Sequence, residues 1–290
     1  MIFVQQLVNA LQLGSIYALV ALGYSMVYGI IKLLNFAHGD VIMVGGYVAI
    51  LTLAAGLPPV IAIVLVIVGC TALAVIMEKL AYTPLRNAPR ISVLITAIGV
   101  SLLLQNLAQL IFAARAQPVH IPFPTGSLRI GEISFTYPML ITIGLSLLSM
   151  LALNYIVQRT KLGKAMRAVS EDMEAAQLMG INVNSIVTFT FAVGAALAGV
   201  GAVLYFVRFP VVSPTVGALL GLKAFIAAVL GGIGSIPGAM LGGFAIGFLE
   251  VIIAAVGLTS WVDGAVFVVL ILVLLVRPSG LMGQKIVEKV

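Results

Sequence analysis

The stretch that decides the fold is residues 59–80, PVIAIVLVIVGCTALAVIMEKL, in which the only charged side chains are Glu78 and Lys79 near its end. It is long enough to cross a bilayer as a helix, for which about 20 mostly apolar residues are needed. The whole chain has the same character, with 62% hydrophobic and 8% charged residues. Because soluble domains carry about 25% charged residues, the composition predicts a polytopic membrane protein.

Working outward from this stretch, we predict an all-α transmembrane bundle that forms one domain, residues 1–290, with no internal repeat. The predicted spans are residues 5–31, 38–56, 59–80, 91–114, 137–157, 185–207, 236–257 and 260–277. Residues 214–233 are apolar but contain glycines and Lys223. They form either a ninth span or a re-entrant half-helix buried in protein, so the chain has eight or nine spans.

The distribution of basic residues predicts the orientation. With nine crossings, one side receives Lys32, Lys79, Arg86, Arg90, Arg159, Lys161, Lys164, Arg167, Arg277, Lys285 and Lys289. The other side receives Arg115, Arg129 and Arg208. Because cytoplasmic loops carry the excess of Lys and Arg, the N-terminus is expected outside and the C-terminus in the cytoplasm. Eight crossings would weaken this bias. The opening stretch has no basic residue before Lys32, so we expect it to remain as a span rather than be removed as a signal peptide.

Two connections are longer than a turn. The external loop, about residues 115–136, alternates apolar and polar residues over 127–133, which predicts a small hairpin. The cytoplasmic loop, about residues 158–184, contains a predicted short helix over about 171–179. We expect Ser170 to cap its N-terminus and Gly180 to end it.

Within this helix, Glu171 and Asp172 fall in the first turn, where carboxylates are stabilising. Ala175 and Ala176 are expected to be exposed beside Leu178 and Met179. Such a short helix suits insertion into a groove of a partner protein. The alternative is a loop helix that lies on the cytoplasmic ends of the spans.

Several kinds of chemistry lack the residues they need. The only Gly-Lys pair, Gly163-Lys164, is followed by Ala165, so a phosphate-binding loop is missing. The two histidines, His38 and His120, are far apart and not in a zinc motif. Ser235 lies in a glycine-rich break rather than a nucleophile motif. We therefore predict no catalytic residue, metal or cofactor, and the clustered basic residues indicate membrane orientation rather than nucleic-acid binding.

Acidic residues bear on the energy source. Among them, we place only Asp40, Glu250 and Asp263 in or near spans, each close to an end. A proton- or sodium-coupled carrier often keeps an ionisable group near mid-membrane. This placement disfavours a secondary carrier without excluding it, because unwound backbone also binds Na⁺.

Polar residues in apolar surroundings form three candidate groups. Asn35, His38 and Asp40 lie where the first span returns into the second and are expected to hydrogen-bond together. The fourth span carries Thr96, Ser101, Gln105 and Asn106, which either line a pathway or bond between helices. Lys223 needs a counter-charge, for which Glu250 is the candidate. In addition, Gly238, Gly242, Gly243 and Gly247 are spaced for close helix packing.

Four stretches resemble known families. Residues 174–180, EAAQLMG, match the E-A-A-x-x-x-G core of the coupling segment in bacterial ABC import permeases, without the Leu-Pro that follows it elsewhere. Residues 14–23 (GSIYALVALG), 34–40 (LNFAHGD) and 230–239 (LGGIGSIPGA) resemble the Liv-type branched-chain amino-acid permease family, in particular the shorter of its two permeases. Together the four stretches follow the family's order from end to end.

The resemblance implies a permease subunit in the bacterial cytoplasmic membrane that forms half of a translocation pathway. It implies three kinds of partner: a second related permease, two ATP-binding subunits and an extracytoplasmic substrate-binding protein. Coupling to the ATPase is expected at Glu171, Asp172, Glu174, Ala175, Ala176 and Gly180. The alternatives are a permease of the same type for urea or short amides, and a stand-alone secondary transporter or channel. An intramembrane enzyme is a more distant one.

Overall fold

The computed structural model describes residues 2–86, 88–130, 133–277 and 279–283. Its helices are α1 (Ile2–Ile31), α2 (His38–Ala54), α3 (Pro59–Met77), α4 (Arg90–Phe112), α5 (Tyr137–Arg159), α6 (Lys161–Glu171), α7 (Met173–Leu178), α8 (Val183–Arg208), α9 (Val216–Gly231), α10 (Ile236–Ala255) and α11 (Val262–Val276). A π-helical turn η1 (Glu78–Tyr82) follows α3, and a 3₁₀ turn η2 (Thr259–Trp261) precedes α11. The predicted all-α membrane bundle is confirmed. Of the tail residues used in the charge count, Lys285 and Lys289 lie outside the described residues.

Among the described residues, seven helices are long and apolar enough to cross a membrane. The two shorter apolar helices, α2 and α9, have 17 and 16 residues. Both begin inside the bundle. A Cβ on Gly23, well within α1, would lie 2.9 Å from the carbonyl oxygen of Gly194 in α8 and would overlap the ring of His38. His38 is the first residue of α2, so α2 starts deep between α1 and α8.

The N-terminal ends of α2 and α9 meet. Gly217 is the second residue of α9, and a Cβ there would lie 2.7 Å from the Cα of Asp40, the third residue of α2. A Cβ on Gly221 would likewise lie 2.7 Å from the Cα of Gly39. Only glycine permits so close an approach of two backbones. The two short helices therefore start at one point inside the bundle and run away from each other.

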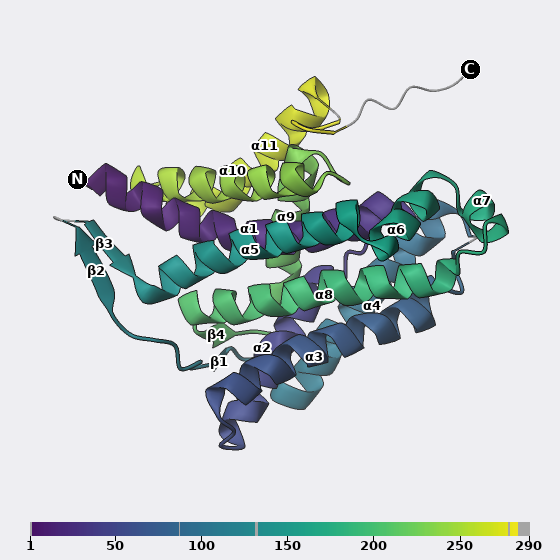
Figure 1. The fold of residues 1–290 in the computed structure, drawn as a ribbon. Coiled ribbons are helices and arrows are strands. Elements are labelled where there is room, and N and C mark those ends of the chain that lie inside the picture. Colours follow the sequence, from purple (N-terminus) through teal and green to yellow (C-terminus); the bar gives the residue numbers. More distant parts are fainter. Residues whose placement is uncertain (1, 87, 131–132, 278, 284–290) are drawn as a thin grey trace.

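Two four-helix units, α1–α4 and α8–α11, make matching helix contacts. Their first helices, α1 and α8, run in opposite directions (Figure 1). In the first unit α2 packs against α3 and α4, and in the second α9 packs against α10 and α11. Between units, α1 contacts α9 and α10 as α8 contacts α2 and α3. Such inverted repeats occur in many transporters. The sequence shows no internal repeat, so this correspondence is seen in the helix contacts alone.

Glycines bring the central helices together. Gly247 of α10 lies against backbone atoms of Gly14 in α1, and Gly243 of α10 lies against those of Ala18. Neither Gly247 nor Gly243 has room for a Cβ. On another face of α10, Gly242 packs against Ala227 of α9. The close packing predicted from the glycine spacing is confirmed.

Small sheets lie at the end of the molecule where α1 begins. β2 (Ser127–Ile130) and β3 (Ile133–Thr136) form the predicted antiparallel hairpin, and β1 (Gln117–Pro118) pairs with β4 (Val211–Val212). Gln5 Nε2 donates to the carbonyl oxygen of Ser134 at 3.2 Å, and Gln5 Oε1 accepts from the backbone N–H of Ser134 at 3.0 Å. Figure 1 shows this hairpin end and, at the opposite end, α6 and α7. The bundle thus has two distinct ends, here called the hairpin end and the α7 end.

Candidate functional site

The segment between α5 and α8 consists of two helices rather than the single helix predicted. Thr160 caps α6 by accepting from the N–H of Gly163 at 3.0 Å. Gly163, Met166 and Val169 of α6 are buried against the bundle, and their spacing of three is that of one helical face. This amphipathic helix fixes the position of α7.

Asp172, not Ser170, is the N-cap before α7. Its carboxylate accepts from the N–H groups of Glu174 at 2.9 Å and Ala175 at 3.0 Å. The hydroxyl of Ser170, still inside α6, donates to the carbonyl oxygen of Arg167 at 2.7 Å. A carboxylate accepts both N–H groups and suits the positive start of a helix better than a hydroxyl. The predicted cap at Ser170 and the start at residue 171 were therefore wrong.

The end of α7 agrees with the prediction. Gly180 has φ of +82°, a conformation that favours glycine. The N–H of Gly180 bonds the carbonyl oxygen of Gln177 at 2.9 Å, and that of Ile181 bonds Ala176 at 3.0 Å. Asn182 then caps α8, accepting from the N–H of Ser185 at 3.1 Å.

The tip of this segment is exposed and apolar. Leu178 is 89% exposed and Met179 is 83% exposed. Glu171, Asp172, Glu174 and Ala175 are also exposed, whereas Ala176 is buried. The predicted exposure of Ala176 was wrong, because α7 turns this residue toward the bundle. A shallow groove beside the tip is lined by Gln177 and residues 180–184.

The sequence suggested that the side chains of Asn35, His38 and Asp40 hydrogen-bond to one another. The structure shows that they do not. Asn35 Oδ1 accepts from the hydroxyl of Tyr82 at 2.7 Å, and Asp40 Oδ1 accepts from Gln105 Nε2 at 3.1 Å. Residues two apart on a helix face different directions, so His38 and Asp40 meet different neighbours. Asn35 belongs to the preceding loop.

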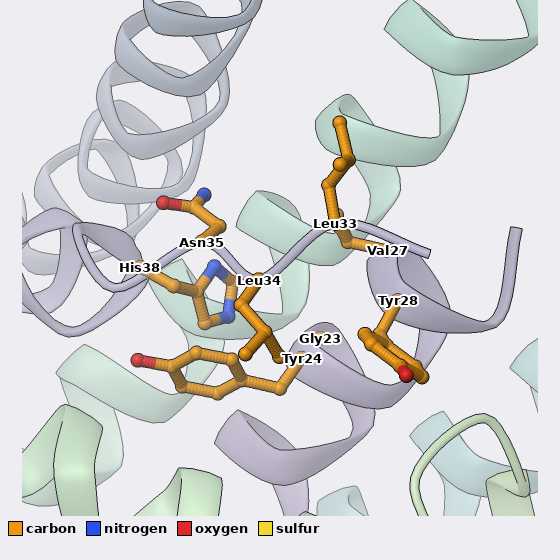
Figure 2. Close-up of a pocket in the computed structure, with 8 residues that line it drawn as sticks. All are labelled: Gly23, Tyr24, Val27, Tyr28, Leu33, Leu34, Asn35 and His38. Carbon is orange, nitrogen blue, oxygen red and sulfur yellow. The ribbon is translucent and has the colours of Figure 1, made fainter. Parts of the chain in front are cut away.

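His38 lines a narrow pocket where the chain re-enters the bundle. Figure 2 shows its ring between the Asn35 side chain and the ring of Tyr24. The His38 and Tyr24 rings pack edge to face with their centroids 4.7 Å apart. Because Gly23 has no side chain, the His38 ring fits against α1.

The four polar residues of α4 divide into two pairs. Gln105 donates to Asp40 and also to the hydroxyl of Ser101, at 3.0 Å. Thr96 and Asn106 bond only within α4, to the carbonyl oxygens of Ser92 at 2.9 Å and Leu102 at 2.7 Å. Gln105 therefore connects α4 to α2, with Ser101 supporting it. Thr96 and Asn106 make no bond to another helix.

Lys223 has two carboxylate partners, of which the sequence indicated one. Its Nζ lies 2.8 Å from Glu250 Oε1, as predicted, and 2.6 Å from Asp263 Oδ1. The hydroxyl of Tyr17 lies 3.1 and 3.0 Å from the two oxygens of Glu250. Glu250 is buried within α10 rather than near its end, and Asp263 was treated as an interfacial residue. This Lys223 cluster joins α1, α9, α10 and α11.

Glu78 is a buried carboxylate that the sequence reasoning did not count among the acidic residues in or near spans, although the predicted span 59–80 contains it. It is 1% exposed and starts η1, directly after α3. Thr188 of α8 donates to Oε2 at 2.8 Å, Thr83 bonds Oε1, and Arg86 lies 3.6 Å from Oε1. The signal that could have found it was its position inside the stretch 59–80.

Ser235 supports the break between α9 and α10. Its hydroxyl accepts from the N–H of Gly238 at 3.2 Å, as an N-cap does. Gly232 and Gly234 have positive φ, which agrees with the predicted glycine-rich break. Among the described residues, no group of three His, Cys, Asp or Glu side chains is placed to hold a metal ion.

The sequence matches the family described as branched-chain amino acid transport system / permease component, over residues 6–275. It is 45% identical to the high-affinity branched-chain amino acid transport system permease protein BraD of Pseudomonas aeruginosa, covering 99% of this chain and 98% of BraD. It is 42% identical to LivH of Escherichia coli K12, a permease of the same description, with the same coverage. Among solved structures, it resembles PsaBC from Streptococcus pneumoniae with a TM-score of 0.51, 17% identity, and coverage of 93% of this chain and 91% of that one. That likeness concerns the fold alone.

Proposed function

The chain belongs to the permease component family of branched-chain amino acid transport systems, and from this premise we propose that it forms half of the pathway of an ATP-driven importer. The proposed cargo is leucine, isoleucine, valine or another hydrophobic amino acid. The full-length identity of 45% and 42% to permeases of that description carries the proposal. The relatives are transport permeases, and no enzymatic activity is assigned to the chain itself. Their names favour amino acid cargo over urea or short amides.

We propose that the tip of α7 docks on an ATP-hydrolysing subunit. Leu178 and Met179 are almost fully exposed there, and α6 holds the segment against α5, α1 and α8. An apolar knob on a fixed base is suited to a groove in a partner. A second related permease would complete the pathway, and each of the two permeases would receive one of two ATPase subunits.

The α7 end is proposed to face the cytoplasm and the hairpin end the outside, where an extracytoplasmic binding protein would deliver the substrate. Lys161, Lys164 and Arg167 of α6 support this, as does Arg86, which bonds Asn184 at the start of α8 at 2.6 Å. Arg129 is the only basic residue in the hairpin sequence, residues 127–136. An excess of basic residues is typical of cytoplasmic faces.

Uptake by the complex tests this function. The chain would be purified with its bound subunits, placed in liposomes, and supplied with ATP, the binding protein, and labelled leucine or labelled urea. Leucine uptake that requires ATP and the binding protein is expected. Equal uptake of leucine by the isolated chain without ATP would contradict the ATP-driven role, and uptake of urea in place of leucine would contradict the cargo.

A further inference from the structure

We propose that Gln105 and Asp263 are positioning residues of the transport cycle, each holding the last helix of its unit to a short helix that starts inside the bundle. The two contacts are Asp40–Gln105, between α2 and α4, and Lys223–Asp263, between α9 and α11. They are called the two tethers below. The proposal rests on the importer function proposed above and adds to it the residues that transmit motion to α4 and α11.

The tethers join corresponding helices of the two units, although they lie at different heights along them. In the first unit α4 runs parallel to α2, because Gln105 meets Asp40 and, about two turns later on both helices, Phe112 stacks on Tyr47 with ring centroids 4.1 Å apart. In the second, α11 runs parallel to α9: Asp263 meets Lys223, and the chain beyond α11 bonds the end of α9 from Leu281 N to Leu230 O at 2.9 Å. In both units the short helix supplies a buried charged side chain and the last helix supplies its partner.

The last helices bury few of their residues in the chain. In the most apolar 18-residue stretch of each span, 17% is buried for α4 and 6% for the span that contains α11. The corresponding values are 89% for α1 and 67% for α8. Asp40 is completely buried and Lys223 is 9% exposed. A buried charge that loses its partner is strongly unfavourable, so Gln105 restrains the sliding of α4 along α2. Lys223 also bonds Glu250, so in the second tether Asp263 sets the position of α11 more than it stabilises the buried charge.

The short helices are also in contact with each other. Backbone atoms of Gly39 approach Gly217 and Gly221 with no room for a methyl group. A shift of α2 along its axis must therefore displace α9, and through the tethers both last helices move. The route from α7, the proposed docking site of the ATPase, is continuous, because α7 leads into α8 and α8 packs along α2.

A purely structural role would predict lower stability and no specific loss of coupling, so the experiment separates the two. In the reconstituted complex, Gln105→Leu removes the partner of Asp40, and Asn106→Leu is the matched control on the same helix. Leucine uptake per ATP hydrolysed is expected to fall about tenfold in Gln105→Leu. In Asn106→Leu it is expected to stay within about twofold.

Reversal of the pair tests the contact itself. Gln105→Glu places a second carboxylate at Asp40 and is expected to lower coupling as Gln105→Leu does. The exchange Asp40→Asn with Gln105→Glu restores an amide and a carboxylate and is expected to recover most of it. In the second tether, Asp263→Asn should lose coupling and Asp263→Glu should keep it.

The tethers are disproved if Gln105→Leu couples as well as Asn106→Leu. They are also disproved if the exchange variant assembles but couples no better than Gln105→Glu. A wild-type complex that takes up urea but not leucine would contradict the proposed cargo alone. The variants would then be ranked by the stimulation of ATP hydrolysis by the binding protein, in which the same order is expected.

Discussion

At the scale of single residues, the Lys223 cluster is the most concentrated set of charges inside the bundle. The side chains of Lys223 and Glu250 are 11% and 9% exposed, whereas that of Asp263 is 50% exposed. Water therefore screens the bond to Asp263, and the pair Lys223–Glu250 carries most of the electrostatic energy. The hydroxyl of Tyr17 adds a hydrogen bond to the carboxylate of Glu250.

Removal of one partner of this pair should be costly. Lys223→Ala leaves Glu250 buried without a cation and is expected to reduce the free energy of unfolding by about 3–5 kcal/mol. Thermal unfolding of the chain in detergent measures this, with Arg129→Ala in the exposed hairpin as the control. The double variant Lys223→Ala with Glu250→Ala should recover part of the loss; a double variant that is as unstable as the sum of the two single ones would argue against the pair.

Individual contacts were predicted where only one partner was available. Lys223 lies in an otherwise apolar stretch, so a carboxylate had to be near it, and Glu250 was identified correctly. Asp263 and Glu78 were missed because a position near the end of a span indicates solvent when only the sequence is known. The partners of Asn35 and Asp40 come from η1 and α4, which the sequence does not bring together.

At the scale of elements, α6 and α7 form the segment that is proposed to dock on an ATPase. α6 is bound to the bundle by one face, Asp172 redirects the chain, and α7 presents Leu178 and Met179. The sequence predicted the helix, its end at Gly180 and its exposed apolar tip. It did not separate Ser170 from Asp172 as the cap, because both residue types are favoured there and tertiary contacts decide.

Changes in this segment should uncouple transport without affecting insertion. Gly180→Trp places a bulky side chain at a positive φ beside the tip, and Glu174→Lys reverses a charge on its exposed face. Each is expected to lower leucine uptake per ATP hydrolysed about tenfold at an unchanged amount of protein in the membrane.

Gly257→Trp is the matched control for the first change, because Gly257 also has a positive φ and open space around it but lies beyond α10, at the opposite end. Unchanged uptake in both Gly180→Trp and Glu174→Lys would contradict the coupling role of α7.

At the scale of the whole molecule, two inverted units share one core, with α5 and the coupling segment between them. Composition sufficed to predict a membrane bundle, because no soluble surface can be made from so few charged residues. For residues 214–233 the sequence left two alternatives, a ninth span or a re-entrant half-helix, and did not predict that α9 starts inside the bundle. The start of α2 inside the bundle was not foreseen either. α2 is apolar and only slightly short, and its depth depends on Gly23, Gly194 and Gly217, whose neighbours lie on other helices.

The orientation can be measured directly on the whole chain. Ser127→Cys at the hairpin end and Gln177→Cys at the α7 end place single exposed thiols at opposite ends. A membrane-impermeant maleimide is expected to label Ser127→Cys in intact cells and Gln177→Cys only after permeabilisation. The unmodified chain is the control, because its Cys70 is buried. The reverse pattern would place the coupling segment outside and exclude its docking on a cytoplasmic ATPase.

The meeting of α2 and α9 has an electrical consequence. The start of a helix carries a partial charge of about +0.5, so two starts at one point create roughly one unit of positive charge. Asp40 supplies one negative charge at the same point and is shielded from water. The middle of the bundle is thus close to neutral only while this position bears a carboxylate. Without one, the electrostatic potential at this point would become positive, and the interior would attract anions.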